Sequence, residues 1–126
     1  MRVIGFDAAT DDTVVAAVND GTVTFESAVG PGTDGRPEHS RALLAGIGGA
    51  VESLGGWDRT DRIAVGLGPG TFTGLRIAVS TASGLAMSTG TPATGVSTLE
   101  AMAVSMADDR ATAVPVLDAK RGEVFL

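Results

Sequence analysis

One stretch decides the fold of this chain: Gly66-Leu67-Gly68-Pro69-Gly70-Thr71-Phe72-Thr73-Gly74-Leu75-Arg76. The apolar segment 63–67 at its start is typical of a short buried strand, central in a sheet and parallel to the first strand of the chain. The small and apolar residues that follow favour a helix over 73–88. A strand, a tight glycine-rich turn and a helix therefore follow one another here.

The turn itself is a candidate binding site. A glycine-rich turn ahead of a helix exposes backbone N–H groups at the helix N-terminus, and such groups suit an anion. Gly68, Gly70 and Thr71 are therefore candidate phosphate-binding residues. The Gly-Lys-Ser/Thr of a P-loop is missing. The alternative, which we favour on physical grounds, is a tight turn that packs the helix closely on its strand.

The residues on either side of this stretch predict alternating strands and helices. Asn19-Asp20-Gly21 is a strong hairpin signal because these residues tolerate positive φ. Ser97 and Glu100 form a capping-box pattern at the start of a third helix. The order predicts an α/β domain that opens with an antiparallel meander. The predicted strands are 3–7, 13–18, 22–29, 63–67 and 92–96, and the predicted helices are 38–54, 73–88 and 97–107.

Two further strands are predicted near the end of the chain. Segments 114–118 and 122–126 are apolar, and no turn or helix follows to cover the second. We therefore expect one domain over 1–110 and the start of a second, truncated domain over 111–126.

Composition and charge exclude several classes of protein. The 126 residues include no cysteine, so disulfides, thiolate chemistry and cysteine zinc sites are excluded. The formal net charge of −6 argues against tight, direct binding of nucleic acid, so any link to RNA is expected to run through a partner. No apolar run approaches the roughly 20 residues that span a bilayer. No signal-peptide pattern opens the sequence, and we expect a cytoplasmic protein without a membrane role.

Residues 68–86 carry a resemblance to a known family. Their sequence, GPGTFTGLRIAVSTASGLA, resembles the signature of the TsaB (YeaZ) family, whose usual form is GPGSFTGLRIGVATAKGLA. The resemblance extends to Ile4-Gly5-Phe6-Asp7-x-x-Thr10, to His39-Ser40-x-x-Leu43-Leu44, and to residues 95–101 and 118–124. It touches nearly the whole chain, as the N-terminal domain of that family.

The resemblance implies a fold and a role. The fold is that of an actin-like ATPase (ribonuclease H-like), with a mixed five-stranded sheet and the start of a second, similar domain. The role is that of a non-catalytic subunit that binds TsaD, and also the ATPase TsaE, in the complex that adds threonylcarbamoyl to tRNA adenosine next to the anticodon. This chain alone would bind no cofactor. ATP and Mg²⁺ would be used by the complex, and tRNA would be reached only through it.

One departure from the catalytic relative supports a non-catalytic role. TsaD carries an H-x-x-x-H metal site, and the corresponding positions here are Thr98 and Met102. Neither side chain is a ligand for the expected metal. No metal site and no catalytic residue are therefore expected in this chain.

The first two helices are expected to form a docking face. Small residues on 73–88 would let another helix approach closely, and 38–54 offers bulkier side chains, so the pair would meet the same pair on a second molecule as a four-helix bundle. An intramolecular core is the alternative; the resemblance favours the interface, and leaves open whether the chain alone is a homodimer. The predicted interface residues are His39, Leu43, Leu44, Ile47, Thr73, Leu75, Arg76, Val79, Ser80 and Ser83.

Four side chains have competing interpretations. Asp7 and Thr10 lie where actin-like ATPases hold metal and phosphate contacts, which makes them candidates for positioning Mg²⁺. The favoured alternative is that Asp7 ends a strand and caps the turn after it. His39 is a candidate ligand or base, but without a partner in a recognisable pattern it is more simply a histidine at a helix start, on a surface or an interface. Arg76 either pairs with an acid or a phosphate at the interface or is a solvated helix charge.

Two enzymatic hypotheses compete with the subunit role. A glycoprotease-like metallopeptidase needs a nucleophile–base pair or a metal cluster, and the sequence contains no such pattern. A small-molecule kinase of the actin-like superfamily would hydrolyse ATP with Asp7 as a key residue.

Overall fold

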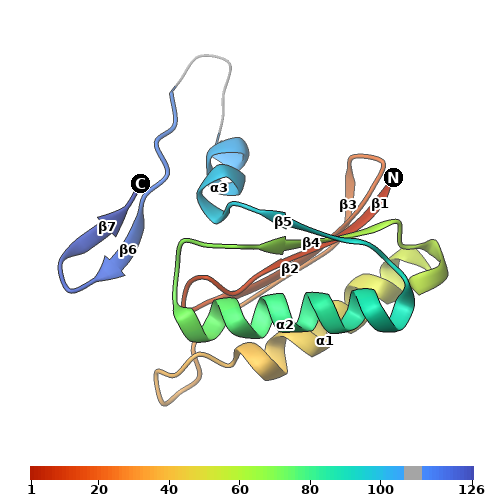
Figure 1. Ribbon diagram of the computed structural model, residues 1–126, viewed down its shortest axis with the longest axis horizontal. Helices are drawn as coiled ribbons and strands as arrows, with labels where there is room; N and C mark the ends of the chain where they lie inside the picture. The colour runs from red at the N-terminus through yellow and green to blue at the C-terminus, as the bar shows by residue number, and fades with distance from the viewer. Residues whose placement is uncertain (107–111) are drawn as a thin grey trace.

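A computed structural model describes residues 1–106 and 112–126 of the chain. Its main element is a mixed five-stranded sheet in the order β3-β2-β1-β4-β5, with helices on both faces (Figure 1). The strands are β1 (Arg2–Asp7), β2 (Thr13–Asn19), β3 (Thr22–Val29), β4 (Arg62–Gly66) and β5 (Ala93–Val96). The helices are α1 (His39–Leu54), α2 (Phe72–Thr89), α3 (Thr98–Met106) and the short 3-10 helix η1 (Trp57–Arg59).

The predicted elements up to residue 106 are confirmed. Their observed ends differ from the predicted ends by one residue at most. The predicted end of the third helix at residue 107 lies outside the described part of the chain. The sequence patterns did not predict η1, which is a single turn and too short to show a periodicity.

The first three strands form the predicted antiparallel meander. Asp7 pairs with Val14 in β2, and Ala17 of β2 pairs with Phe25 in β3. At the hairpin between β2 and β3, Asp20 has φ 48° and Gly21 has φ 83°. Positive φ at both central residues is the requirement of a two-residue type I′ turn. The Asn-Asp-Gly signal in the sequence is therefore confirmed.

The two helical crossovers create the parallel half of the sheet. β4 runs parallel to β1, and β5 runs parallel to β4. α1 and α2 lie side by side on one face of the sheet, and α3 lies on the other (Figure 1). Because parallel strands end at the same edge, Asp7 at the end of β1 lies next to the glycine-rich turn after β4. Ligands of open α/β sheets bind at this carboxyl edge.

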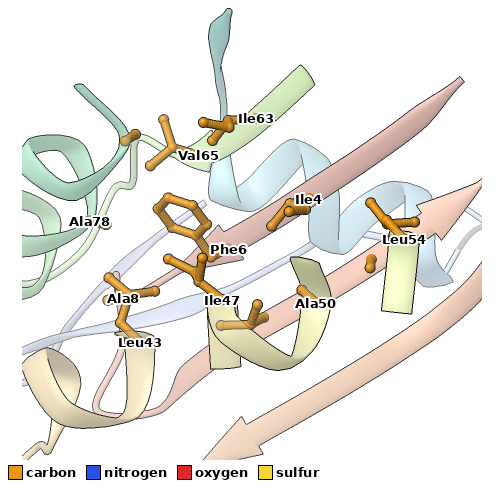
Figure 2. Packing of buried hydrophobic residues seen from close by; sticks show 13 residues of the cluster. Ile4, Phe6, Ala8, Leu43, Ile47, Ala50, Leu54, Ile63, Val65 and Ala78 are labelled. Carbon is orange, nitrogen blue, oxygen red and sulfur yellow. The ribbon is translucent and has the colours of Figure 1, made fainter. Parts of the chain in front are cut away.

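The main hydrophobic core fills the space between the sheet and the two long helices. Alternate residues of β1, β2 and β4 point into it, and α1 contributes residues at helical spacing (Figure 2). Burial of one such large aliphatic side chain contributes about 1.5–3 kcal/mol. The cluster consists of Ile4, Phe6, Ala8, Val15, Ala17, Leu43, Ile47, Ala50, Leu54, Ile63, Val65, Ala78 and Ala82.

Two glycines bring α1 close to the sheet. A Cβ atom at Gly46 would lie 2.7 Å from Cγ2 of Val15, and one at Gly49 would lie 2.5 Å from Cε2 of Phe25. Real Cβ atoms do not approach other atoms so closely, so any larger residue would push the helix away from β2 and β3.

The last two strands form a separate antiparallel pair, β6 (Leu117–Lys120) and β7 (Glu123–Phe125). The prediction of a strand over 114–118 was wrong at its start, because β6 begins only at Leu117. Pro115 lacks the N–H that a ladder requires, which accounts for the later start. The predicted boundary between residues 110 and 111 lies outside the described residues, so the division into domains stays a prediction.

Within residues 1–106 and 112–126, no helix combines the length and the apolar character that crossing a bilayer requires.

Candidate functional site

Both carboxylate oxygens of Asp7 accept hydrogen bonds from other residues of this chain. Its Oδ1 accepts a hydrogen bond from the backbone N–H of Ala9 at 2.6 Å. Its Oδ2 accepts one from the hydroxyl of Thr98, also at 2.6 Å. Gly66 makes room for this carboxylate, since a Cβ there would lie 1.9 Å from Oδ2. The side chain therefore caps the turn after β1 and also reaches the start of α3.

Thr98 extends this contact to the glycine-rich turn. Its hydroxyl oxygen accepts from the N–H of Gly68 at 3.1 Å, and its own N–H donates to the Gly68 carbonyl at 2.9 Å. One hydrogen-bonded network thus joins the end of β1, the end of β4 and the start of α3. Its members are at least half-buried, and it holds the carboxyl edge of the sheet together. The sequence pattern did not link these three segments.

The glycine-rich turn packs tightly against the end of β1. A Cβ at Gly70 would lie 2.2 Å from the carbonyl oxygen of Ala9, and one at Gly74 would lie 1.8 Å from that of Ala8. Thr71 caps α2, because its hydroxyl accepts from the N–H of Gly74 at 3.3 Å. Close helix–strand packing therefore explains these glycines. Binding of phosphate by Gly68, Gly70 and Thr71 stays a prediction.

A cleft of about 430 Å³ lies beside this turn. It brings together Thr10, Gly70 and Thr71 from the predicted phosphate set, and Lys120 from β6 reaches into the same cleft. The Lys120 ammonium lies 3.3 Å from Asp11, an exposed ion pair of the kind that adds little stability. Thr10 accepts from the N–H of Asp12 at 3.3 Å, which is a local turn contact.

Metal-ligating side chains do not gather in the part of the chain that the structure describes. No group of three or more His, Asp or Glu residues is placed to hold an ion there. Of the two residues that the sequence analysis matched to the H-x-x-x-H of TsaD, Thr98 is buried and Met102 follows one turn later on α3. The predicted Mg²⁺-positioning role of Asp7 and Thr10 stays untested.

Burial corrects part of the predicted docking face. Leu43 is 0% exposed, Ile47 is 4% exposed and His39 is 4% exposed, so these three side chains pack inside this chain and present nothing to a partner. His39 bonds through Nδ1 to the Thr13 hydroxyl at 2.8 Å, which ties the start of α1 to β2. Leu75 is half-buried and packs against Gly68.

The remaining predicted residues share one exposed surface. We define the two-helix face by its exposed side chains on α1 and α2: Leu44, Phe72, Thr73, Arg76, Val79, Ser80, Ser83 and Met87. Leu44 is 63% exposed, Phe72 is 74% exposed and Met87 is 88% exposed. Between the helices runs a groove of about 480 Å³, with Ile77 on its wall.

Two members of this face, Met87 and Phe72, were absent from the predicted interface residues, and Phe72 adds an aromatic ring to it. Its guanidinium neighbour Arg76 lies one helical turn later, with Cζ 5.5 Å from the centre of the Phe72 ring. An aromatic residue four positions before an arginine on a helix predicts this contact. That spacing is the signal that would have found it.

The fold and this site define the structural class of the domain. The sheet order β3-β2-β1-β4-β5, with two crossover helices on one face and α3 on the other, is that of an actin-like (ribonuclease H-like) domain. A comparison with protein families agrees with this class. The model of the TsaD family, tRNA N6-adenosine threonylcarbamoyltransferase, matches residues 29–126 of this chain.

Individual relatives narrow the class further. The tRNA threonylcarbamoyladenosine biosynthesis protein TsaB of Escherichia coli is 38% identical over 129 residues, which cover 99% of this chain and 53% of that protein. TsaB of Bacillus subtilis is 41% identical over 64 residues, covering 51% of this chain and 28% of that protein. The structure of YeaZ from Pseudomonas aeruginosa superimposes with a TM-score of 0.69 at 30% identity, covering 82% of this chain and 48% of that one.

The chain therefore belongs to the TsaB (YeaZ) group of the TsaD family. It spans about half the length of the E. coli protein and of the Pseudomonas structure.

Proposed function

We propose that this protein acts in the cytoplasm in the biosynthesis of threonylcarbamoyladenosine in tRNA, as a non-catalytic subunit that binds TsaD through the two-helix face. The names of its relatives support the pathway. In this proposal TsaD carries out the transfer, TsaE joins the same complex, and the complex uses ATP and Mg²⁺. The net charge of −6 favours contact with tRNA through the partner rather than through this chain.

The exposed apolar surface of α1 and α2 is the observation that carries the proposal. Each helix already buries one side against the sheet. Leu44, Phe72 and Met87 are exposed and lie outside that packing. Large apolar side chains gathered on an exposed surface mark an interaction site. The small residues Thr73, Ser80 and Ser83 lie among them and would let a partner helix approach closely.

The two-helix face suits a helical partner better than the full set of predicted interface residues does. Leu43 and Ile47 hold α1 on the sheet, so the outer side of the helix is left free for Leu44. A groove between two helices, walled by Ile77 and Leu44, suits side chains from a second helix pair.

Binding to TsaD from the same organism tests the proposal. Isothermal titration calorimetry of the full chain measures the affinity, and a reconstituted complex measures threonylcarbamoyladenosine formation. Leu44→Glu places a charge in the lining of the groove and should abolish both signals. Val23→Glu is the matched control, since Val23 is 57% exposed on β3, away from the two-helix face, and should leave both unchanged. Undiminished binding by Leu44→Glu would refute the proposed face.

The enzymatic alternatives have weaker support. A metallopeptidase needs a cluster of metal ligands, and the described residues contain none. A kinase would rely on Asp7, whose two carboxylate oxygens already accept hydrogen bonds from Ala9 and Thr98. Substoichiometric metal and absent ATP turnover in the purified chain would agree with the subunit role, and ATP turnover lost in Asp7→Ala would contradict it.

A further inference from the structure

Arg76 is the single charged residue of α2, and it lies within the two-helix face. Its side chain is exposed, yet the guanidinium is placed over the ring of Phe72 at 5.5 Å. Such stacking restricts the guanidinium and orients it before any partner arrives. A restricted side chain loses less conformational freedom on binding, so it suits a role in recognition.

No acid within the described part of the chain pairs with Arg76. The ion pairs there involve the N-terminus, Arg36 and Lys120. The groove beside Arg76 is lined by hydroxyl and apolar side chains such as Ser40, Thr73 and Leu44, and it contains no carboxylate. In a chain with a net charge of −6, this surface therefore carries a positive charge that no acid of the described residues pairs, among apolar and hydroxyl side chains.

An unpaired guanidinium is costly in a closed interface. A partner that covers Phe72 and Leu44 would also remove water from Arg76, and a desolvated charge without a counter-ion opposes binding. A partner with a carboxylate at that point would instead form a charge-assisted hydrogen bond, often with two N–H donors at once. Charge complementarity therefore separates suitable from unsuitable partners.

We propose that Arg76 is the specificity-determining residue of the two-helix face, and that it selects a partner helix carrying a carboxylate over a second copy of this chain. This inference rests on the proposed function. Two copies joined by a two-fold axis would bring the same patch to both sides. The interface would then hold two Arg76 side chains, and the lining of the groove would offer no carboxylate to pair with either.

Arg76→Met tests the inference because methionine keeps much of the side-chain length and removes the charge. Against TsaD from the same organism, titration calorimetry should show an affinity at least about tenfold weaker for Arg76→Met than for the unchanged protein. Arg76→Lys should fall between them, since an ammonium cannot form the paired contacts of a guanidinium. Arg36→Met is the matched control: Arg36 is 86% exposed in the loop before α1 and should not affect binding.

Two further readouts separate recognition from a general loss of structure. The affinity of the unchanged protein should fall as salt rises, and this dependence should flatten in Arg76→Met. Sedimentation equilibrium of the chain alone should show stronger self-association for Arg76→Met than for the unchanged protein. Thermal unfolding should be the same for both, because the side chain is exposed.

The outcomes distinguish the two claims. If the unchanged protein does not bind TsaD, the proposed function fails and the inference fails with it. If it binds, but Arg76→Met binds equally well with the same salt dependence, the inference alone is overturned. Weaker binding with unchanged self-association would also overturn the selection of a partner over a second copy.

Discussion

The hydroxyl of Thr98 donates a hydrogen bond of 2.6 Å to Oδ2 of Asp7, across 91 positions of sequence. The contact joins the end of the first strand to the start of α3. Gly68 belongs to the same network through two hydrogen bonds with Thr98. Thr98, which the family resemblance matched to a metal-ligand position of TsaD, supplies a structural hydroxyl in this network.

Thr98→Val should destabilise the domain. Valine has the same shape but neither donates to Asp7 nor accepts from Gly68, and a partly buried polar group left without its partner costs about 1–3 kcal/mol. Urea unfolding followed by circular dichroism measures the loss. Thr98→Ser keeps the hydroxyl and is the control; equal stability of the two variants would show that the network contributes nothing.

Two glycines of α2 should respond in opposite directions to alanine. At Gly74 a Cβ would lie 1.8 Å from the carbonyl oxygen of Ala8, whereas at Gly84 a Cβ would meet no side chain or other segment of the described residues within 4 Å. Gly74→Ala should cost about 1–3 kcal/mol or more through overpacking. Gly84→Ala should stabilise by about 0.5–1 kcal/mol through helix propensity. Thermal unfolding of both variants checks this, and a shift of the same sign in both would contradict the packing explanation.

Removal of the Thr13 hydroxyl should loosen the start of α1. Thr13 is 2% exposed and bonds to Nδ1 of His39, whose other ring nitrogen has no partner within the described residues. Thr13→Val leaves the buried ring without a hydrogen bond, at a cost of about 1–3 kcal/mol. Hydrogen exchange at the first turn of α1 should become faster in this variant. Thr13→Ser, which retains the hydroxyl, should exchange like the unchanged protein.

Asp20 should give the fold a small dependence on acidic pH. A hydrogen bond from the N-terminal amino group of Met1, and then its charge, lower the pKa of the Asp20 carboxyl below its usual 3.8. A carboxyl whose pKa is lower in the folded state stabilises the fold above its unfolded pKa, and this contribution is lost as pH falls through the folded pKa.

Comparison with Asp20→Asn isolates that contribution. The variant should be slightly less stable than the unchanged protein at neutral pH, and the difference should shrink as the pH falls below 3.8 toward the lower pKa of the folded state. Because both residues of the pair are largely exposed, added salt should also reduce the difference. Urea midpoints measured across this pH range provide the check; a difference that grows on acidification would contradict the sign.

Phe72 and Arg76 should act as a unit in partner binding. Phe72→Ala removes both apolar contact area and the ring that orients the guanidinium. The losses in affinity for TsaD caused by Phe72→Ala and Arg76→Met should therefore not add in the double variant. Calorimetric titration of the four proteins completes this cycle, and strictly additive losses would show that the stacking has no role in recognition.

Most of the fold could be predicted from the sequence because its signals are local. The hairpin at Asp20 and Gly21 depends on which residues tolerate positive φ, and α1 depends on apolar residues at helical spacing. The error at β6 was also local, since Pro115 should have excluded residues 114–116 from a ladder.

The candidate site was less predictable. Leu43 and Leu44 are neighbours with the same chemistry, and both were assigned to the interface. In the structure one is fully buried and the other is 63% exposed. Adjacent residues on a helix point about 100° apart, so only the position of the sheet decides which of them faces solvent.

The sequence by itself determined the order of strands and helices, the tight turn after β4 and the family resemblance, because hydrogen bonding within a turn or a helix and the period of apolar residues are properties of neighbouring residues. Tertiary structure alone decided that Asp7 meets Thr98, and that Arg76 lines the same groove as Leu44 with no acid of residues 1–106 and 112–126 paired to it. Those relationships depend on how distant segments pack, and packing is settled only when the whole core closes around residues such as Ile4 and Leu43.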